Sequence, residues 1–175
     1  MLFGGYDRTR QAFETYRQAR RAAALPAPGE DRFSCLAFCY VGDTDEEAFR
    51  VGQKIPWFLT VSIKSAPQMS KFMPGQLPPE LTPGAWRAGA SKRPTNLTVQ
   101  ALIAQGQMFA GNPDTVVKQI KTFRERVGGG GRIVMMTRQG LVTHAEAMKS
   151  FGLAAKEVLP QLQHLPPVEQ RAAAE

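Results

Sequence analysis

The chain has 175 residues, of which 43% are hydrophobic and 21% are charged, and its formal net charge is +7. This length allows one ordinary domain with its own core, but a complete (β/α)8 barrel needs about 250 residues and is excluded. No apolar run has the length of a membrane span and no signal peptide is visible, so we expect a cytoplasmic protein without a membrane partner. Arginines are spread over the predicted helix faces without an aromatic-interleaved basic cluster, so we expect solvated surfaces and no nucleic-acid partner.

The N-terminal residues Met1-Leu2-Phe3-Gly4-Gly5 are typical of the end of a buried strand. A helix is predicted from Asp7 to about residue 24, because apolar residues recur on one face while arginines lie away from it. Pro26 and the residues after it break this helix. A chain that begins in the middle of a strand suggests a fragment, a truncated gene or part of something larger.

After the apolar run that begins at Ile133, the clearest strand covers residues 33–41, where nearly every side chain is apolar. This pattern favours a parallel strand that is covered on both faces. Cys35 and Cys39, the only cysteines, point to the same side of such a strand and lie too far apart for a disulfide, so we expect small buried thiols. A helix with a capping box of Thr44 and Glu47 follows.

Regular patterns fail over residues 56–95, which contain seven prolines. Large side chains are scattered among these prolines, including Trp57, Phe72 and Trp86. A long irregular stretch inside a domain is usually a functional lid or a poorly ordered connection, and the aromatic content argues against complete disorder. Both interpretations stay open. A further helix is predicted over about residues 97–105.

The next helix is predicted to begin at Asn112, a good N-cap, with Pro113 at its first position. An apolar stripe runs along this helix until the glycines at 128–131 end it. The short apolar run at 133–136 predicts another strand that is covered on both faces.

The last helix should open with a capping box of Thr143 and Glu146 and stop at Pro160. It leaves residues 163–175 as a frayed tail.

These elements predict an α/β fold with three parallel strands, at 2–4, 33–41 and 133–136, each covered by a helix. Three such strands cannot close into a barrel, and the first and the last would each present an open edge that invites pairing with another chain. The chain should therefore need a complement. If the chain is complete, the alternative is an open sheet in a two-layer or three-layer sandwich.

Three motifs carry a resemblance to a known family. Residues 111–116 read Gly-Asn-Pro-Asp-Thr-Val, residues 157–162 read Glu-Val-Leu-Pro-Gln-Leu, and residues 44–48 read Thr-Asp-Glu-Glu-Ala. In this order and spacing they resemble the C-terminal part of the bacterial luciferase-like, flavin-dependent monooxygenases. The resemblance implies a partial (β/α)8 TIM barrel over residues 1–162, made of the last three βα units with a lid-like insertion at 56–95 after the second strand.

The resemblance also implies a function. The complete enzyme would oxidise a small organic substrate with O2 and reduced FMN, which a flavin reductase could supply. In the family most flavin contacts and the catalytic histidine lie in the first five βα units, so this chain alone should be inactive and no catalytic residue is assigned. The alternatives are a non-catalytic flavin-binding or dimerisation module and a deazaflavin (F420)-dependent oxidoreductase of the same fold. The expected partner is the missing barrel half or a second copy of the chain.

Candidate site residues are those at the C-terminal ends of the predicted strands, where parallel α/β sheets place their chemistry. The cofactor candidates are Gly4 and Gly5, which allow close approach, and Arg138, whose guanidinium suits an anion. The substrate and lid candidates are Tyr40, Trp57, Phe72, Trp86 and Met136. The histidines, His144 and His164, have no partner at metal-ligand spacing, so no metal is expected.

Overall fold

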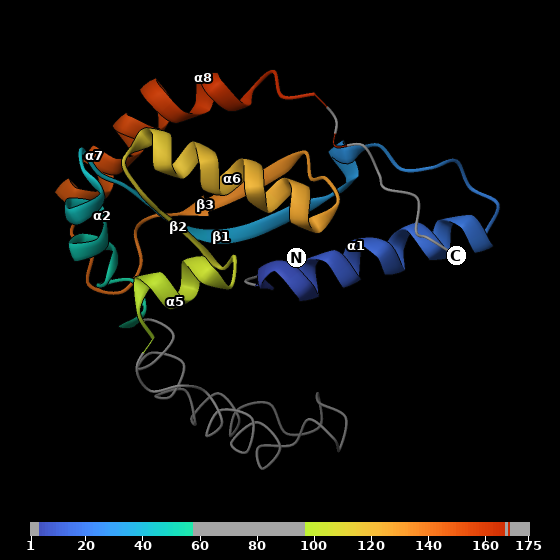
Figure 1. Cartoon of the computed structure of the whole chain (residues 1–175), viewed down its shortest axis with the longest axis horizontal. Coiled ribbons are helices and arrows are strands. Elements are labelled where there is room, and N and C mark those ends of the chain that lie inside the picture. The colour runs from blue at the N-terminus through green and yellow to red at the C-terminus, as the bar shows by residue number, and fades with distance from the viewer. Residues whose placement is uncertain (1–3, 58–96, 167, 169–175) are drawn as a thin grey trace, which may run out of the picture.

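The computed structural model describes residues 4–57, 97–166 and 168. Its centre is a parallel three-stranded sheet of β1 (Ser34–Val41), β2 (Met108–Gly111) and β3 (Arg132–Met136), as Figure 1 shows. The strand order is β2-β1-β3, so the longest strand lies in the middle. Phe38 is the residue of β1 that pairs with both neighbours, with Met108 at the start of β2 and with Met136 at the end of β3.

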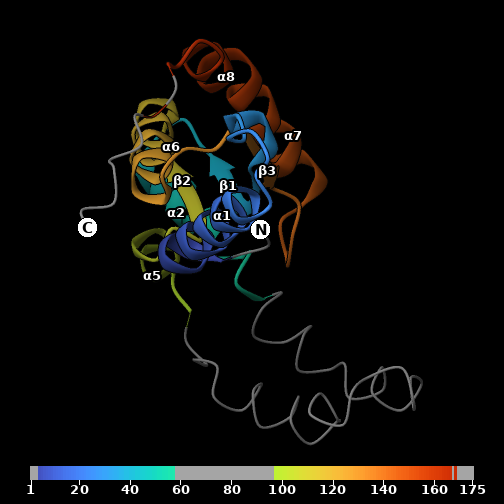
Figure 2. The same cartoon turned by 90° about the vertical axis from the view of Figure 1, so that its right-hand side faces the viewer.

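The described helices are α1 (Gly5–Ala22), α2 (Asp45–Gly52), α5 (Val99–Ala104), α6 (Pro113–Val127), α7 (His144–Leu153) and α8 (Leu159–Leu162). A 3-10 turn, η1 (Glu30–Arg32), precedes β1, and a π-helical turn, η4 (Ala154–Val158), joins α7 to α8. Figure 2 shows that these helices lie around the sheet on several sides.

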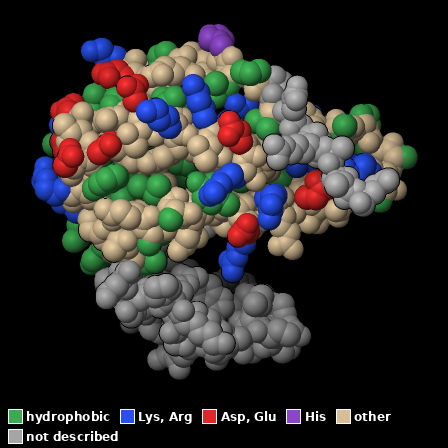
Figure 3. All heavy atoms as spheres, in the orientation of Figure 1, with side chains coloured by type: hydrophobic (Ala, Val, Ile, Leu, Met, Phe, Trp, Pro, Cys, Tyr) green, Lys and Arg blue, Asp and Glu red, His purple; other side chains and the backbone are tan. Residues whose placement is uncertain are grey.

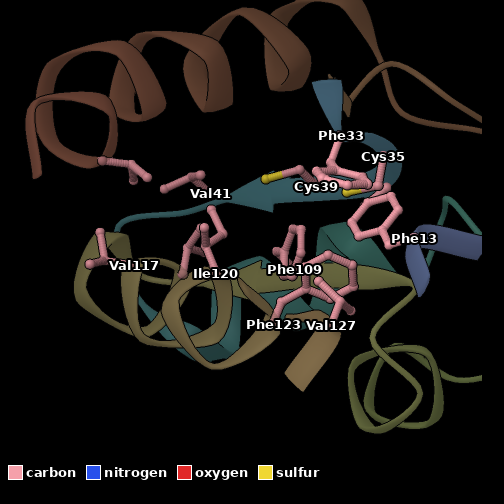
Figure 4. Close-up of a cluster of buried hydrophobic side chains, with 13 residues drawn as sticks. Phe13, Phe33, Cys35, Cys39, Val41, Phe109, Val117, Ile120, Phe123 and Val127 are labelled. Carbon is pink, nitrogen blue, oxygen red and sulfur yellow. The ribbon is translucent and has the colours of Figure 1, made fainter. Parts of the chain in front are cut away.

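Side chains of β1 alternate between two cores, because successive residues of a strand point to opposite faces of the sheet. Cys35, Ala37, Cys39 and Val41 face the first core, which Figure 4 shows packed against α6. This core also includes Phe13 of α1 and Val158 of η4. Phe38 and Tyr40 face the second core, with side chains of α2, α5 and α7. The described part of the chain is therefore layered, with helices on both faces of its sheet.

The predicted starts of α2, α6 and α7 agree closely with the structure. Asn112 caps α6 by accepting a hydrogen bond from the Thr115 N–H (2.9 Å). Thr143 and Glu146 form the full capping box of α7. Thr44 caps α2, but the Glu47 carboxylate accepts its hydrogen bond from the N–H of Asp43 instead of closing the box on Thr44.

The end of α6 is also as predicted, because Gly128 adopts the left-handed conformation (φ 75°) that a side chain would disfavour. The Arg17 side chain of α1 donates a hydrogen bond to the Gly128 carbonyl oxygen (2.5 Å) and lies over the Phe33 ring, 4.4 Å from its centroid. Arg17 is only 6% exposed. A buried guanidinium thus joins α1 to the carbonyl end of α6, where a positive charge is favourable.

Both cysteines are buried free thiols on the same face of β1, as predicted. Burial raises the pKa of Cys35 to about 11 and that of Cys39 to about 12. These thiols therefore stay protonated at neutral pH.

Several strand predictions were wrong or incomplete. Strand β2 was not predicted, because no element was assigned to the residues between the helix at 97–105 and the N-cap Asn112. Gly4 directly precedes α1 and lies in no strand, and residues 1–3 are outside the described residues. Strand β3 is not covered on both faces: it lies at the edge of the sheet and Val134 is 53% exposed. An apolar run reports the preference of its side chains for burial and not whether a neighbour is present to bury them.

The last helix does not stop at Pro160. It continues as α8, where Pro160 occupies one of the first positions and its missing N–H costs little. Beyond it, the Pro166 carbonyl accepts a hydrogen bond from Arg124 (3.3 Å) and the Val168 N–H donates to Glu30 (2.7 Å). The described part of the tail is thus held against η1 and α6, and fraying of residues 169–175 stays a prediction.

Candidate functional site

The carboxyl ends of β1 and β2 lie side by side, with Val41 paired to Gly111. This is the edge of a parallel sheet where ligand sites usually lie. Gly111 has a φ of 153°, and an added Cβ would lie 2.5 Å from Thr115 Cγ2 and 2.8 Å from Asp45 Oδ1. Only glycine fits this position without displacement of its neighbours.

Asp45, in the first turn of α2, joins the ends of these two strands. Its Oδ1 accepts a hydrogen bond from the Asn112 N–H (2.7 Å), and its Oδ2 accepts one from the Thr115 hydroxyl (3.2 Å). The Thr-Asp-Glu-Glu-Ala motif therefore contacts the Gly-Asn-Pro-Asp-Thr-Val motif directly. In the sequence the two motifs are separate signals, since nothing in their spacing shows that they meet.

Helix α7 closes the same edge. The Ser150 hydroxyl, which is buried, accepts a hydrogen bond from the Val41 N–H (2.8 Å). The Tyr40 hydroxyl donates to the Glu146 carbonyl oxygen (3.3 Å), and the Tyr40 side chain is fully buried. Burial, with the nearby Glu47 carboxylate next in importance, raises the pKa of Tyr40. The end of β1 is thus covered by groups of α7.

A salt bridge fixes the start of α7 to the end of α2. Lys54 Nζ lies 2.5 Å from Glu146 Oε1, and the hydrogen bond from Lys54, with a second from the Thr143 N–H, lowers the pKa of Glu146 to about 2. The loop before α7 also packs here, because the Leu141 N–H donates to the Lys54 carbonyl oxygen (3.2 Å). A Cβ at Gly140 would collide with that same oxygen.

An open pocket of about 650 Å³ lies at the start of α1. Its lining residues come from α1, from the turn between α5 and β2, and from the last turn of α6: Gly4, Gly5, Tyr6, Asp7, Arg8, Arg10, Ala104, Gln105, Gln107 and Arg126. Because Gln107 immediately precedes β2, this pocket lies beside the beginning of that strand and not at the carboxyl edge of the sheet.

The wall of this pocket depends on two glycines. Gly5 has a φ of 63°, and a Cβ there would collide with the Gln105 carbonyl oxygen, which accepts a hydrogen bond from the Tyr6 N–H (2.9 Å). A Cβ at Gly106 would lie 2.9 Å from the Tyr6 ring. The Arg126 guanidinium lies over the Tyr6 ring, 4.5 Å from its centroid. Three arginines against one aspartate make the lining basic, so its chemistry suits an anionic group.

The structure does not bring the predicted site residues together. Gly4 and Gly5 line the pocket beside the start of β2, whereas Arg138 is exposed beyond the end of β3. Since the strands are parallel, these positions lie at opposite edges of the sheet. Whether any of them binds a cofactor stays a prediction.

The remaining candidates are also dispersed. Tyr40 is fully buried and Met136 is partly buried against the second core. Trp57 is 39% exposed, and Phe72 and Trp86 lie outside the described residues. His144 opens α7 and His164 lies in the tail. Within residues 4–57, 97–166 and 168, no three His, Cys, Asp or Glu side chains are grouped so that they could hold a metal ion.

Basic and acidic side chains alternate over the face that Figure 3 shows, which includes the outer surface of α6. In the described part of the chain, no helix combines the length and the apolar character that crossing a membrane requires.

No protein-family model matches the chain. Two curated proteins of Pseudomonas putida, 2,5-diketocamphane 1,2-monooxygenase 2 and 2,5-diketocamphane 1,2-monooxygenase 1, are each 26% identical to it over 162 residues. These matches cover 92% of this chain but only 42% of each relative. The chain thus spans less than half the length of the curated relatives it matches.

Solved structures give the same picture of the fold. The oxygenating constituent of 3,6-diketocamphane monooxygenase from P. putida, a type II Baeyer-Villiger monooxygenase in complex with FMN, aligns with a TM-score of 0.63 and 22% identity over 96% of this chain and 43% of that one. The coenzyme F420-dependent tetrahydromethanopterin reductase of Methanopyrus kandleri aligns with a TM-score of 0.52 and 13% identity, over 91% of this chain and 43% of that one.

The chain therefore has the α/β fold of one part of these larger oxidoreductases. Together the comparisons confirm its resemblance to the bacterial luciferase-like, flavin-dependent monooxygenases.

Proposed function

We propose that this chain is the C-terminal part of a luciferase-like flavin-dependent monooxygenase, which oxidises a small organic substrate with reduced FMN and O2. The observation that carries the proposal is the contact between two of the three family-like motifs through Asp45, in a chain that matches monooxygenases over 92% of its length. The FMN in the P. putida neighbour supports this cofactor, and its description as an oxygenating constituent supports a separate reductase.

The described residues of this chain do not by themselves fit a flavin. At the carboxyl edge of the sheet, Ser150 and Tyr40 bind α7 against the end of β1. The pocket at α1 offers arginines for a phosphate, but it lies at the opposite edge. We therefore assign flavin binding and catalysis to the part of the longer protein that this chain does not span. The contribution of this chain is a packed sheet in which β3 is an edge strand among the described strands.

The sheet order supports a specific position in the barrel. Consecutive barrel strands lie side by side. Strand β3 follows β2 in sequence but pairs with β1, on the side of β1 that β2 does not occupy. We infer that β1 and β3 are neighbouring barrel strands, and that the outer edge of β3 would receive the next strand of the ring.

Flavin titration tests this assignment. Chain 1–175 should be colourless when purified and should leave the absorbance of added FMN near 450 nm unshifted. A form extended with the in-frame coding DNA upstream of Met1 should contain further βα units and bind FMN. Stoichiometric FMN binding by residues 1–175 alone would contradict the proposal and favour a self-contained flavin-binding module.

A second candidate is an F420-dependent oxidoreductase that transfers hydride. It is favoured by the fold likeness to the tetrahydromethanopterin reductase. Titration of the extended form with FMN and with F420 in parallel separates the two candidates, because each cofactor would saturate a site built for it at far lower concentration.

A further inference from the structure

The chain after α8 returns to the part of the molecule where β1 and β3 begin. It leaves α8 through a last turn, in which the Leu165 N–H donates to the Leu162 carbonyl oxygen (3.4 Å). The Val168 N–H then donates to the Glu30 carboxylate (2.7 Å), which belongs to η1 and lies 138 residues earlier in the sequence. We call residues 163–166 and 168 the strap.

Glu30 is the junction at which the strap meets three other parts of the fold. Its Oε1 accepts the hydrogen bond from Val168, and its Oε2 accepts one from Arg124 Nη2 of α6 (2.7 Å). Its carbonyl oxygen accepts hydrogen bonds from the N–H groups of Phe33 (3.0 Å) and Gly131 (2.9 Å), which directly precede β1 and β3. The strap is thereby tied to α6 and to the starts of both strands.

The second contact of the strap depends on the same carboxylate. The side chains of Arg124 and Glu30 are only 13% and 21% exposed, so their ion pair is largely shielded from water. In this position Arg124 Nη2 also donates to the Pro166 carbonyl oxygen of the strap (3.3 Å), and its Nε donates to the Gly130 carbonyl oxygen (3.3 Å). Glu30 therefore binds the strap directly and also orients the arginine that binds it.

This arrangement requires an ionised carboxylate. Arg124 and Val168 each present a donor to a different oxygen of Glu30. A protonated carboxyl group or an amide carries hydrogen at one of the two positions, so that one of the two donors would face another donor. Gly129 leaves the room that the carboxylate needs, because a Cβ there would lie 2.6 Å from Glu30 Oε1.

We propose that the strap is a latch that the Glu30 carboxylate closes. It holds the C-terminal segment against the starts of β1 and β3 while the carboxylate is ionised, and it opens when that charge is removed. Each contact of the latch joins two described residues of this chain. The latch therefore needs neither a flavin nor the missing part of a longer protein.

The charged surroundings of Glu30 set the pH at which the latch opens. Arg124 faces it from α6, while Asp31 and Arg32 of η1 are exposed and pair with each other (3.4 Å). The titratable side chain of the strap, His164, is also exposed. Burial alone would raise the pKa of Glu30, but the hydrogen bonds from Val168 and Arg124 outweigh it and hold this pKa below 4.5. The latch is therefore closed above pH 4.5 and opens as the pH falls below that value.

Amide hydrogen exchange at Val168 tests the latch, because this N–H is the bonded donor. In 15N-labelled chain 1–175 at pH 7 it should exchange about tenfold or more slower than in an unstructured peptide, and Glu30→Gln should remove this protection. Asp31→Asn, at the neighbouring exposed carboxylate, is the matched control and should leave it intact. An unprotected wild-type amide, or protection that survives in Glu30→Gln, would overturn the proposal.

A shortened chain, 1–165, separates the latch from a purely structural role of Glu30. Without the last ten residues, an amide at position 30 can turn its oxygen towards Arg124, because no second donor competes for it. Glu30→Gln should therefore lower the melting temperature of the full chain by about twice as much as that of the shortened chain, or more. Equal losses in the two lengths would mean that Glu30 acts only through η1 and α6, and would overturn the latch.

A pH titration of the wild type tests the latch without any variant. The amide signal of Val168 should shift with the same midpoint as the side-chain carboxyl carbon of Glu30, at a pH below 4.5. A Val168 signal that does not follow the titration of Glu30 would contradict the proposal.

Discussion

The carboxylate of Asp45 accepts a hydrogen bond of 2.7 Å from the backbone N–H of Asn112, which lies 67 residues further along the chain. With the second bond from Thr115, this contact holds the first turn of α2 against the first turn of α6. It fixes the relative position of the two helices on opposite faces of the sheet, at the edge where β1 and β2 end.

Replacement of Asp45 by Ala should lower the free energy of unfolding by about 1–3 kcal/mol, because it leaves the Asn112 N–H without its acceptor. Urea unfolding followed by circular dichroism measures the loss. Asp114→Ala, in the exposed first turn of α6, is the control and should change the free energy by less than about 0.5 kcal/mol. If the two variants lose the same stability, the contact has no special role.

Among the arginines of α1, Arg17 should be the one whose replacement lowers the free energy of unfolding most. Arg17→Met keeps most of the side-chain volume but removes the hydrogen bond to the Gly128 carbonyl and the charge at the end of α6, so we expect a loss of about 2 kcal/mol. Arg21→Met, which removes an exposed pair with Glu14, should be nearly neutral. Thermal unfolding compares them, and equal melting temperatures would contradict this role.

Acid should weaken the attachment of α7. The folded-state pKa of Glu146, about 2, lies below its ordinary value of 4.5. Its contribution to stability is therefore present above pH 4.5 and is lost as the pH falls from 4.5 towards 2. Glu146→Gln should flatten the decline of stability over this range. A decline of the same steepness in the variant would assign it to other carboxylates, such as Glu30, whose pKa is also lowered because its hydrogen bonds outweigh its burial.

The two thiols should be unreactive towards thiol reagents in the folded protein. Burial raises the pKa of both Cys35 and Cys39 far above neutrality, so a thiol reagent at pH 8 should react with neither until the chain unfolds. The reaction rate should therefore follow the urea transition. Rapid modification in the absence of urea would show that the first core opens readily.

Local signals in the sequence were enough to place most helices and the central strand. Thr143, Asn112 and Gly128 mark helix ends through their own backbone and side-chain chemistry, and the structure uses each of them as predicted. Strand β2 was missed because four residues give too short a pattern to be separated from a turn. The pocket at the start of α1 could not be predicted either. Whether Gly5 lies beside Gln105 or at the end of a strand depends on packing between elements about a hundred residues apart. Hydrophobic periodicity carries no information on such packing.

The family resemblance rested on three short motifs. Here too, the sequence was enough for what depends on local order and spacing but not for contacts between distant elements. The motifs identified the relatives correctly, since order and spacing are sequence properties. They did not reveal that Asp45 joins two of them, nor that α7 covers the end of β1 through Ser150.

The most direct test of the whole account is isotope incorporation by the extended protein that contains this chain. Supplied with reduced FMN and its small organic substrate under 18O2, that protein should form a product that is one oxygen atom heavier, with that atom labelled and the other atom of O2 released in water as the reduced FMN is oxidised. Hydride transfer without uptake of label, or equal turnover by residues 1–175 alone, would contradict the assignment of this chain to the C-terminal part of a flavin-dependent monooxygenase.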